Sequence, residues 1–66
     1  MNYKLKKNNF RTALLNNGMS ITDISNKSKV STVTLDKIIN HEGFARAKTC
    51  LKIATALNIN VTELFE

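Results

Sequence analysis

The chain of 66 residues has no proline and no tryptophan, and it has only two glycines and one cysteine. A lone cysteine excludes an internal disulfide framework and fits a reducing cytoplasm. No apolar run is long enough to span a membrane, and the first residues lack the pattern of an export signal. Because there is also no alternating pattern typical of strands, we expect one small all-α domain.

Residues that carry metal or catalytic chemistry are few and isolated. His41 is the only histidine and Cys50 the only cysteine, so the usual soft ligands of a metal site cannot be assembled. The five acidic residues are scattered, and none pairs with a nucleophile and a base in the sequence pattern. We therefore expect that the protein is not an enzyme and that it binds no metal, cofactor or small-molecule ligand. We expect Cys50 to lie in the core.

Acidic residues are also scarce in the first part of the chain. The formal net charge of +5 lies entirely on residues 1–29, whereas residues 30–66 are neutral. Such a gradient fits contact with a polyanion near the N-terminal half, with the C-terminus turned away from it. A solvated basic surface is the alternative, and charge alone does not separate the two.

Apolar periodicity predicts five short helices. The first ends at Gly18, which suits a left-handed C-terminal cap, but Asn2 or Asn8 can start it. Residues 3–7 are therefore either its first turn or a basic arm. The other predicted helices are residues 21–28, 32–40, 46–57 and a short one after Asn60, with residues 41–45 as a loop.

Two serines mark the starts of the second and third helices. Ser20 and Ser31 each have an apolar residue before them and another four residues after them, a hydrophobic staple around a capping side chain. At Ser20, Asp23 stands three residues on and completes a capping box. Asn60 and Glu63 repeat this spacing, which predicts a second box at the last helix.

Two short helices joined by a tight turn, residues 20–40, are the arrangement of a helix-turn-helix, whose second helix enters the DNA major groove. Over residues 8–65 the chain resembles the Cro/phage-repressor (XRE-type) helix-turn-helix family. The distal stretch "LKIATALNINVTELF" is similar to that family's C-terminal signature. The motif itself is matched by Ser20, Ile24-Ser25, Ser28-Lys29, Val30-Ser31 and Leu35.

The resemblance implies a compact bundle of five short helices, a lambda-repressor-like DNA-binding domain. It also implies a sequence-specific transcriptional regulator, a Cro-like repressor of phage or prophage type, that binds double-stranded operator DNA. Four positions depart from the family's pattern. Lys29 stands at the turn position where Gly is usual, so a left-handed residue there would carry a modest strain. Ile39, His41 and Ala45 replace the Glu, Gly and Pro often found after the recognition helix.

The head of the third helix, "STVT", lacks the Gln, Arg or Asn that make bidentate base contacts. Thr32 can hydrogen-bond a base edge, Val33 can pack on a thymine methyl, and Lys37 can reach guanine one turn later. With Asp36, these form the predicted base-contacting set.

A second set is expected to hold phosphates, through basic side chains or through hydroxyls near helix ends. The alternatives are helix capping for the serines and a solvated surface for the rest. The phosphate set consists of Lys6, Lys7, Ser20, Thr22, Lys29, Ser31, Thr34, Asn40, Arg46 and Lys48.

A rival function from another class remains open, because "STVT" is poor in base-reading side chains. The same fold can serve as an antirepressor or modulator that binds a partner repressor protein instead of DNA, with Val33 as an adhesive contact. We also predict a possible homodimer through the C-terminal helix, with Phe65 incompletely covered. The predicted core is Phe10, Leu14, Ile24, Leu35, Ile38, Leu51, Ala54, Leu57 and Leu64.

Overall fold

In the computed structural model, which describes residues 1–66, five helices make 67% of the chain helical, and two short strands pair in a small sheet. The prediction of a mostly helical chain is confirmed, but the chain is not all-α, because it also contains a small sheet. In chain order the elements are β1 (Asn2–Lys4), α1 (Lys7–Asn17), α2 (Ile21–Ser28), α3 (Thr32–Asp36), the π-helical turn η1 (Lys37–His41), β2 (Phe44–Arg46), α4 (Ala47–Leu57) and α5 (Val61–Leu64).

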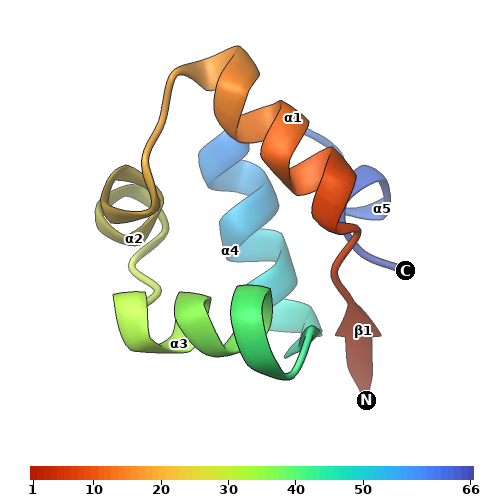
Figure 1. The fold of residues 1–66 in the computed structure, drawn as a ribbon. Helices are drawn as coiled ribbons and strands as arrows, with labels where there is room; N and C mark the ends of the chain where they lie inside the picture. The colour runs from red at the N-terminus through yellow and green to blue at the C-terminus, as the bar shows by residue number, and fades with distance from the viewer.

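Helix α4 forms the centre of the molecule (Figure 1). It contacts α2 on one side and α1, α5 and the two strands on the other. Helices α2 and α3 therefore lie together at one side, and both chain termini lie at the other (Figure 1). No helix is long and apolar enough to cross a membrane.

Left-handed residues end α1 and α4 as the sequence predicts. Gly18 has φ 61° and its backbone N–H bonds back to the carbonyls of Leu14 and Leu15, which are otherwise orphaned at the helix end. Asn58 does the same for α4 at φ 57°. The predicted second helix, residues 21–28, is confirmed at both ends.

The predicted capping box at Asn60 is wrong, because the Asn60 side chain makes no capping bond. In this four-residue helix the backbone N–H of Glu63 donates to the Asn60 carbonyl at 3.0 Å, so the donor that the side chain would satisfy already has a partner.

The N-terminal residues form neither a basic arm nor a first helical turn. Residues 2–4 pair antiparallel with residues 44–46, which replaces the predicted loop there by a strand. On its other side the segment bonds the C-terminus: Lys4 and Glu66 exchange both backbone hydrogen bonds, and Leu5 pairs with Phe65. We call residues 2–6, 43–46 and 64–66 the terminal clasp. The C-terminus therefore lies beside the basic N-terminal segment.

The core prediction is right for most positions and wrong for two. Leu51 is 59% exposed, because the buried stripe of α4 runs through Cys50, Ile53, Ala54 and Leu57 and leaves Leu51 beyond its edge. Leu14 is only half-buried. The residues confirmed in the core are Phe10, Ile24, Leu35, Ile38, Ala54, Leu57 and Leu64.

The terminal clasp adds core residues that helical periodicity did not predict. Leu5, Ala45 and Phe65 are buried, and Phe65 is only 4% exposed, contrary to the expectation that it would be incompletely covered. Cys50 is buried as predicted, and its Sγ donates to the Ala45 carbonyl at 3.4 Å. Burial raises the pKa of the Cys50 thiol, which keeps it protonated as a small apolar residue.

Candidate nucleic-acid interface

Helix α2 begins at a complete capping box. The Ser20 Oγ accepts from the Asp23 backbone N–H at 3.2 Å, and the Asp23 carboxylate accepts from the Ser20 backbone N–H at 2.9 Å. The backbone N–H of Ser20, with its side chain, lowers the pKa of Asp23 below its usual value. Thr22 lies exposed in the same first turn, so both hydroxyls predicted to hold a phosphate lie at the start of α2. The Ser20 hydroxyl already accepts the capping hydrogen bond from the Asp23 N–H.

A tight turn connects α2 to α3. Lys29 adopts φ 65°, the left-handed conformation predicted for it in place of glycine, and its N–H bonds to the Ser25 carbonyl at 2.9 Å. A non-glycine residue there carries strain. The buried Ser28 Oγ compensates by accepting from the Val30 N–H at 3.1 Å, and Val30 is itself buried. The turn is therefore fixed from inside while the Lys29 side chain remains exposed.

Ser31 caps α3, as predicted. Its Oγ accepts from the Thr34 backbone N–H at 3.2 Å and donates to the Thr34 Oγ1 at 3.0 Å. The two hydroxyls predicted to hold a phosphate thus bond each other, while both residues stay exposed.

The outward side of α3 and the start of η1 carry the four predicted base-contacting residues. Thr32, Val33 and Asp36 lie on α3, and Lys37 is the first residue of η1. All four are exposed, with Val33 at 66%. Leu35, 0% exposed, and Ile38 anchor the opposite side in the core. The exposed side is therefore polar, with one acid and one base, and is interrupted by a single exposed valine.

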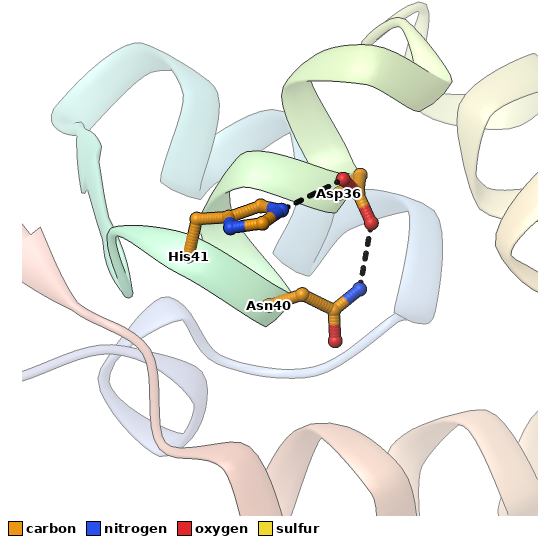
Figure 2. A network of polar contacts seen from close by, with 3 residues as sticks. All are labelled: Asp36, Asn40 and His41. Carbon is orange, nitrogen blue, oxygen red and sulfur yellow. Dashed lines mark hydrogen bonds and ion pairs between the residues drawn. The ribbon is translucent and has the colours of Figure 1, made fainter.

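Past Asp36 the chain continues as η1 instead of stopping at residue 40. The Glu42 backbone N–H bonds to the Lys37 carbonyl at 2.7 Å, the five-residue spacing of a π-helix. Asp36 receives two side chains from this turn: Asn40 Nδ2 donates to Oδ1 at 2.7 Å, and His41 Nε2 lies 3.3 Å from Oδ2 (Figure 2). The sequence offered no signal for this network.

The structure brings three predicted residues into one cleft. Lys37, Thr34 and Arg46 line a depression between α3, η1 and the start of α4. Asn2 and Thr49, which sequence reasoning missed, line it as well, as does the carboxylate-bearing Glu42. Asn2 reaches the cleft because β1 pairs it with Arg46. This pairing joins distant parts of the chain, so no local sequence pattern predicts it. Lys48 is exposed in the first turn of α4.

The two N-terminal lysines of the phosphate set lie elsewhere. Lys6 is half-buried, and its Nζ donates to the Thr62 carbonyl at 3.0 Å. Lys6 and Lys7 line a shallow depression shared with Gly43 and Glu66 at the terminal clasp. The structure therefore does not group them with the hydroxyls of α2 and α3.

An apolar groove lies between α4, α5 and β1. The exposed Leu51 is part of it, and Tyr3, Val61 and Phe65 contribute from the neighbouring elements. This groove, and not a free Phe65, is the apolar surface that the C-terminal helix helps to form.

Searches for similar proteins return no match: no protein-family model, no curated protein and no solved structure matches the chain.

Proposed function

We propose that the protein is a sequence-specific DNA-binding transcriptional regulator, a Cro-like repressor of phage or prophage type with a lambda-repressor-like domain. In this proposal α3 and η1 enter the major groove of operator DNA and α2 lies across the backbone. The observation that carries the proposal is the arrangement of α2 and α3: two side-chain-capped helices, a fixed turn, and an exposed polar side on the second helix.

Charge supports the same interface. The exposed cations are Lys29 in the turn, Lys37 at the start of η1, Arg46 in β2 and Lys48 in the first turn of α4. Lys37 and Arg46 line the same cleft. Cations spaced around a groove-inserted helix neutralise phosphates on both sides of the groove and supply most of the sequence-independent affinity. Thr32, Val33 and Lys37 then carry the sequence-dependent part.

A salt series on duplex binding tests the proposal. Fluorescence anisotropy with a labelled duplex gives the affinity at each salt concentration. For a DNA-binding protein, the logarithm of the affinity falls linearly with the logarithm of the salt concentration, with a slope of about −0.9 for each phosphate neutralised. Failure to bind any duplex at low salt contradicts the proposal.

The exposure of Val33, 66%, favours the second candidate function, an antirepressor or modulator that binds a partner repressor protein. An exposed apolar side chain at the head of a helix packs as well against protein as against a thymine methyl. The replacement Val33→Ser separates the two. It relaxes the preference for one base pair if α3 reads DNA, and it weakens partner binding without changing duplex affinity if α3 binds protein.

Self-association through the C-terminal helix remains a proposal. Its surface is the apolar groove containing Leu51, since α5 contributes Val61 and Phe65 to it. A two-fold dimer would set two recognition helices about 34–36 Å apart on one side of the duplex. Leu51→Lys should convert dimers to monomers in sedimentation velocity, whereas a wild-type chain that is monomeric both free and on DNA contradicts the dimer.

A further inference from the structure

We propose that Asn40 reads an adenine in the bound duplex and that Asp36 is the positioning residue that holds its amide for this contact. The inference rests on the proposed function and deepens it, because it names the base recognised by one side chain of the same interface. It assigns to Asn40 a base contact instead of the phosphate contact expected from its position near the end of the helix.

The π-helical turn creates the arrangement. In an α-helix the residues three and four positions on lie beside a given side chain, whereas in the wider π-turn the fourth and fifth residues do. Asn40 and His41 stand four and five residues after Asp36. Asn40 donates to one oxygen of the carboxylate, and His41 Nε2 lies 3.3 Å from the other (Figure 2). With both oxygens occupied, the Asp36 carboxylate is directed into the protein's own network instead of toward a base.

The chemistry of the carboxylate fixes the orientation of the Asn40 amide. An ionised carboxylate only accepts hydrogen bonds, so the amide nitrogen must lie toward Asp36 and the amide oxygen must point away. Figure 2 shows this orientation, with the oxygen directed away from both partners. One N–H of Nδ2 is used at 2.7 Å, which leaves its second N–H and the amide oxygen as an adjacent donor and acceptor.

A donor beside an acceptor matches adenine in the major groove. The N–H can donate to N7 and the oxygen can accept from the N6 amino group. Guanine offers N7 and O6, two acceptors, so the amide oxygen would meet another oxygen. Because Asp36 prevents the amide from turning over, the site favours adenine over guanine, and a freely rotating asparagine would discriminate less.

Asn40 lies where such a contact is possible. Its Nδ2 bonds the Asp36 carboxylate, which places Asn40 beside Asp36, and Val33 stands one α-helical turn before Asp36. All three are exposed, and Ile38 holds the opposite side of the turn in the core. Asn40 is therefore the last of a row of outward side chains, one turn beyond Asp36.

Selection of duplexes from a random pool tests the inference, with the wild-type chain, Asn40→Ala and Asp36→Ala compared. The wild-type chain should enrich a motif that contains an adenine. In Asn40→Ala, the preference for adenine over the other bases at that position should fall about tenfold or more. Asp36→Ala should relax the same position several-fold while tightening binding to random duplex, since it removes a negative charge near the phosphates. Asn16→Ala, at an exposed asparagine on α1, is the matched control and should select the wild-type motif.

Replacing that adenine by 7-deazaadenine removes N7 and tests the atom directly. The change should weaken wild-type binding about tenfold and leave Asn40→Ala unaffected. Three results overturn the inference while the proposed function stands. They are an unchanged motif in Asn40→Ala, the loss in Asn40→Ala of a preference for a base other than adenine, and equal losses of affinity for both chains on 7-deazaadenine. If wild type enriches no duplex, both the proposed function and the inference fail.

Discussion

The two sides of the molecule hold their helices by different means. On the side of α2 and α3, each helix is preceded by a serine whose side chain accepts a backbone N–H of the first turn. On the side of the terminal clasp, the N-cap residues of α1, α4 and α5 are Lys6, Arg46 and Asn60, and none of these side chains makes a capping bond. Capping of helix starts by side chains is thus confined to the side that we propose binds DNA.

The difference follows from what each side can bury. Helices α2 and α3 are short, and one side of each is exposed, so local caps supply stability that packing does not. Helix α4 instead buries Cys50, Ile53, Ala54 and Leu57, and backbone bonds between opposite ends of the chain close the clasp around it. The side of α2 and α3 thus adds local caps to the core contacts of Ile24, Leu35 and Ile38, while the other side depends on packing and on long-range backbone bonds.

The largest expected effect is in the core of the clasp side. Ile53→Ala should lower the free energy of unfolding by about 2–5 kcal/mol, because Ile53 is 1% exposed and its removal leaves a cavity. Leu51→Ala, two residues earlier on the same helix, should change it by less than about 0.5 kcal/mol. Urea unfolding measures both, and equal losses would show that the buried side of α4 is misassigned.

Lys37→Ala should give the next largest effect, on the side of α2 and α3. It is expected to cost about 1–3 kcal/mol on the selected operator and to flatten the preference at one base pair. Lys7→Ala, at the start of α1 beside the clasp, is the matched control, and it should lower affinity for operator and random duplex alike, with a salt slope reduced by about one. Lys6 is a poorer control, because its Nζ already bonds the Thr62 carbonyl.

If Lys37→Ala instead leaves the duplex preference intact and abolishes binding to a partner repressor, α3 is a protein-binding surface. Equilibrium titrations of both variants with operator and random duplex distinguish these outcomes.

The difference in side-chain capping between α3 and α5 predicts a smaller effect on the free energy of unfolding. Ser31→Ala should lower the free energy of unfolding by about 0.5–2 kcal/mol, because it leaves the Thr34 N–H without its acceptor. Asn60→Ala should change it by less than about 0.5 kcal/mol, since Asn60 makes no capping bond. Thermal unfolding of the two variants provides the comparison, and a larger loss for Asn60→Ala would reverse the assignment of caps to one side.

The smallest effect concerns pH. The pKa of Asp23 is lower in the folded chain, so its stabilising contribution is present above the unfolded pKa and is lost as the pH falls through the folded pKa. The stability difference between wild type and Asp23→Asn should therefore be present at neutral pH and disappear in acid, below about pH 4. A difference that persists unchanged at pH 2 would show that the Asp23 charge does not contribute.

The side of α2 and α3 could be predicted from the sequence better than the side of the terminal clasp. The caps at Ser20 and Ser31, the left-handed Lys29 and the limits of α2 were all predicted, since each depends on residues within four positions. The outward position of Thr32, Val33 and Lys37 followed from the same short-range periodicity.

The clasp was missed because its partners are far apart in the chain. Leu5 and Phe65 become buried only when the two ends meet, and the sequence of neither end specifies that pairing on its own. Leu51 was misplaced because α4 has more apolar positions than one stripe can hold, and the position of the clasp decides which of them are covered. The network at Asp36 depends on a π-helical turn, for which the sequence contains no marker.

Chemical-shift mapping of the isotope-labelled chain during titration with a selected duplex tests most directly which side binds DNA. We predict that the largest amide shifts fall on the start of α2, on α3 and η1, and around Arg46, and that residues 62–66 change little. Shifts concentrated at residues 3–6 and 64–66 or at the groove around Leu51, with α3 unchanged, would contradict the account.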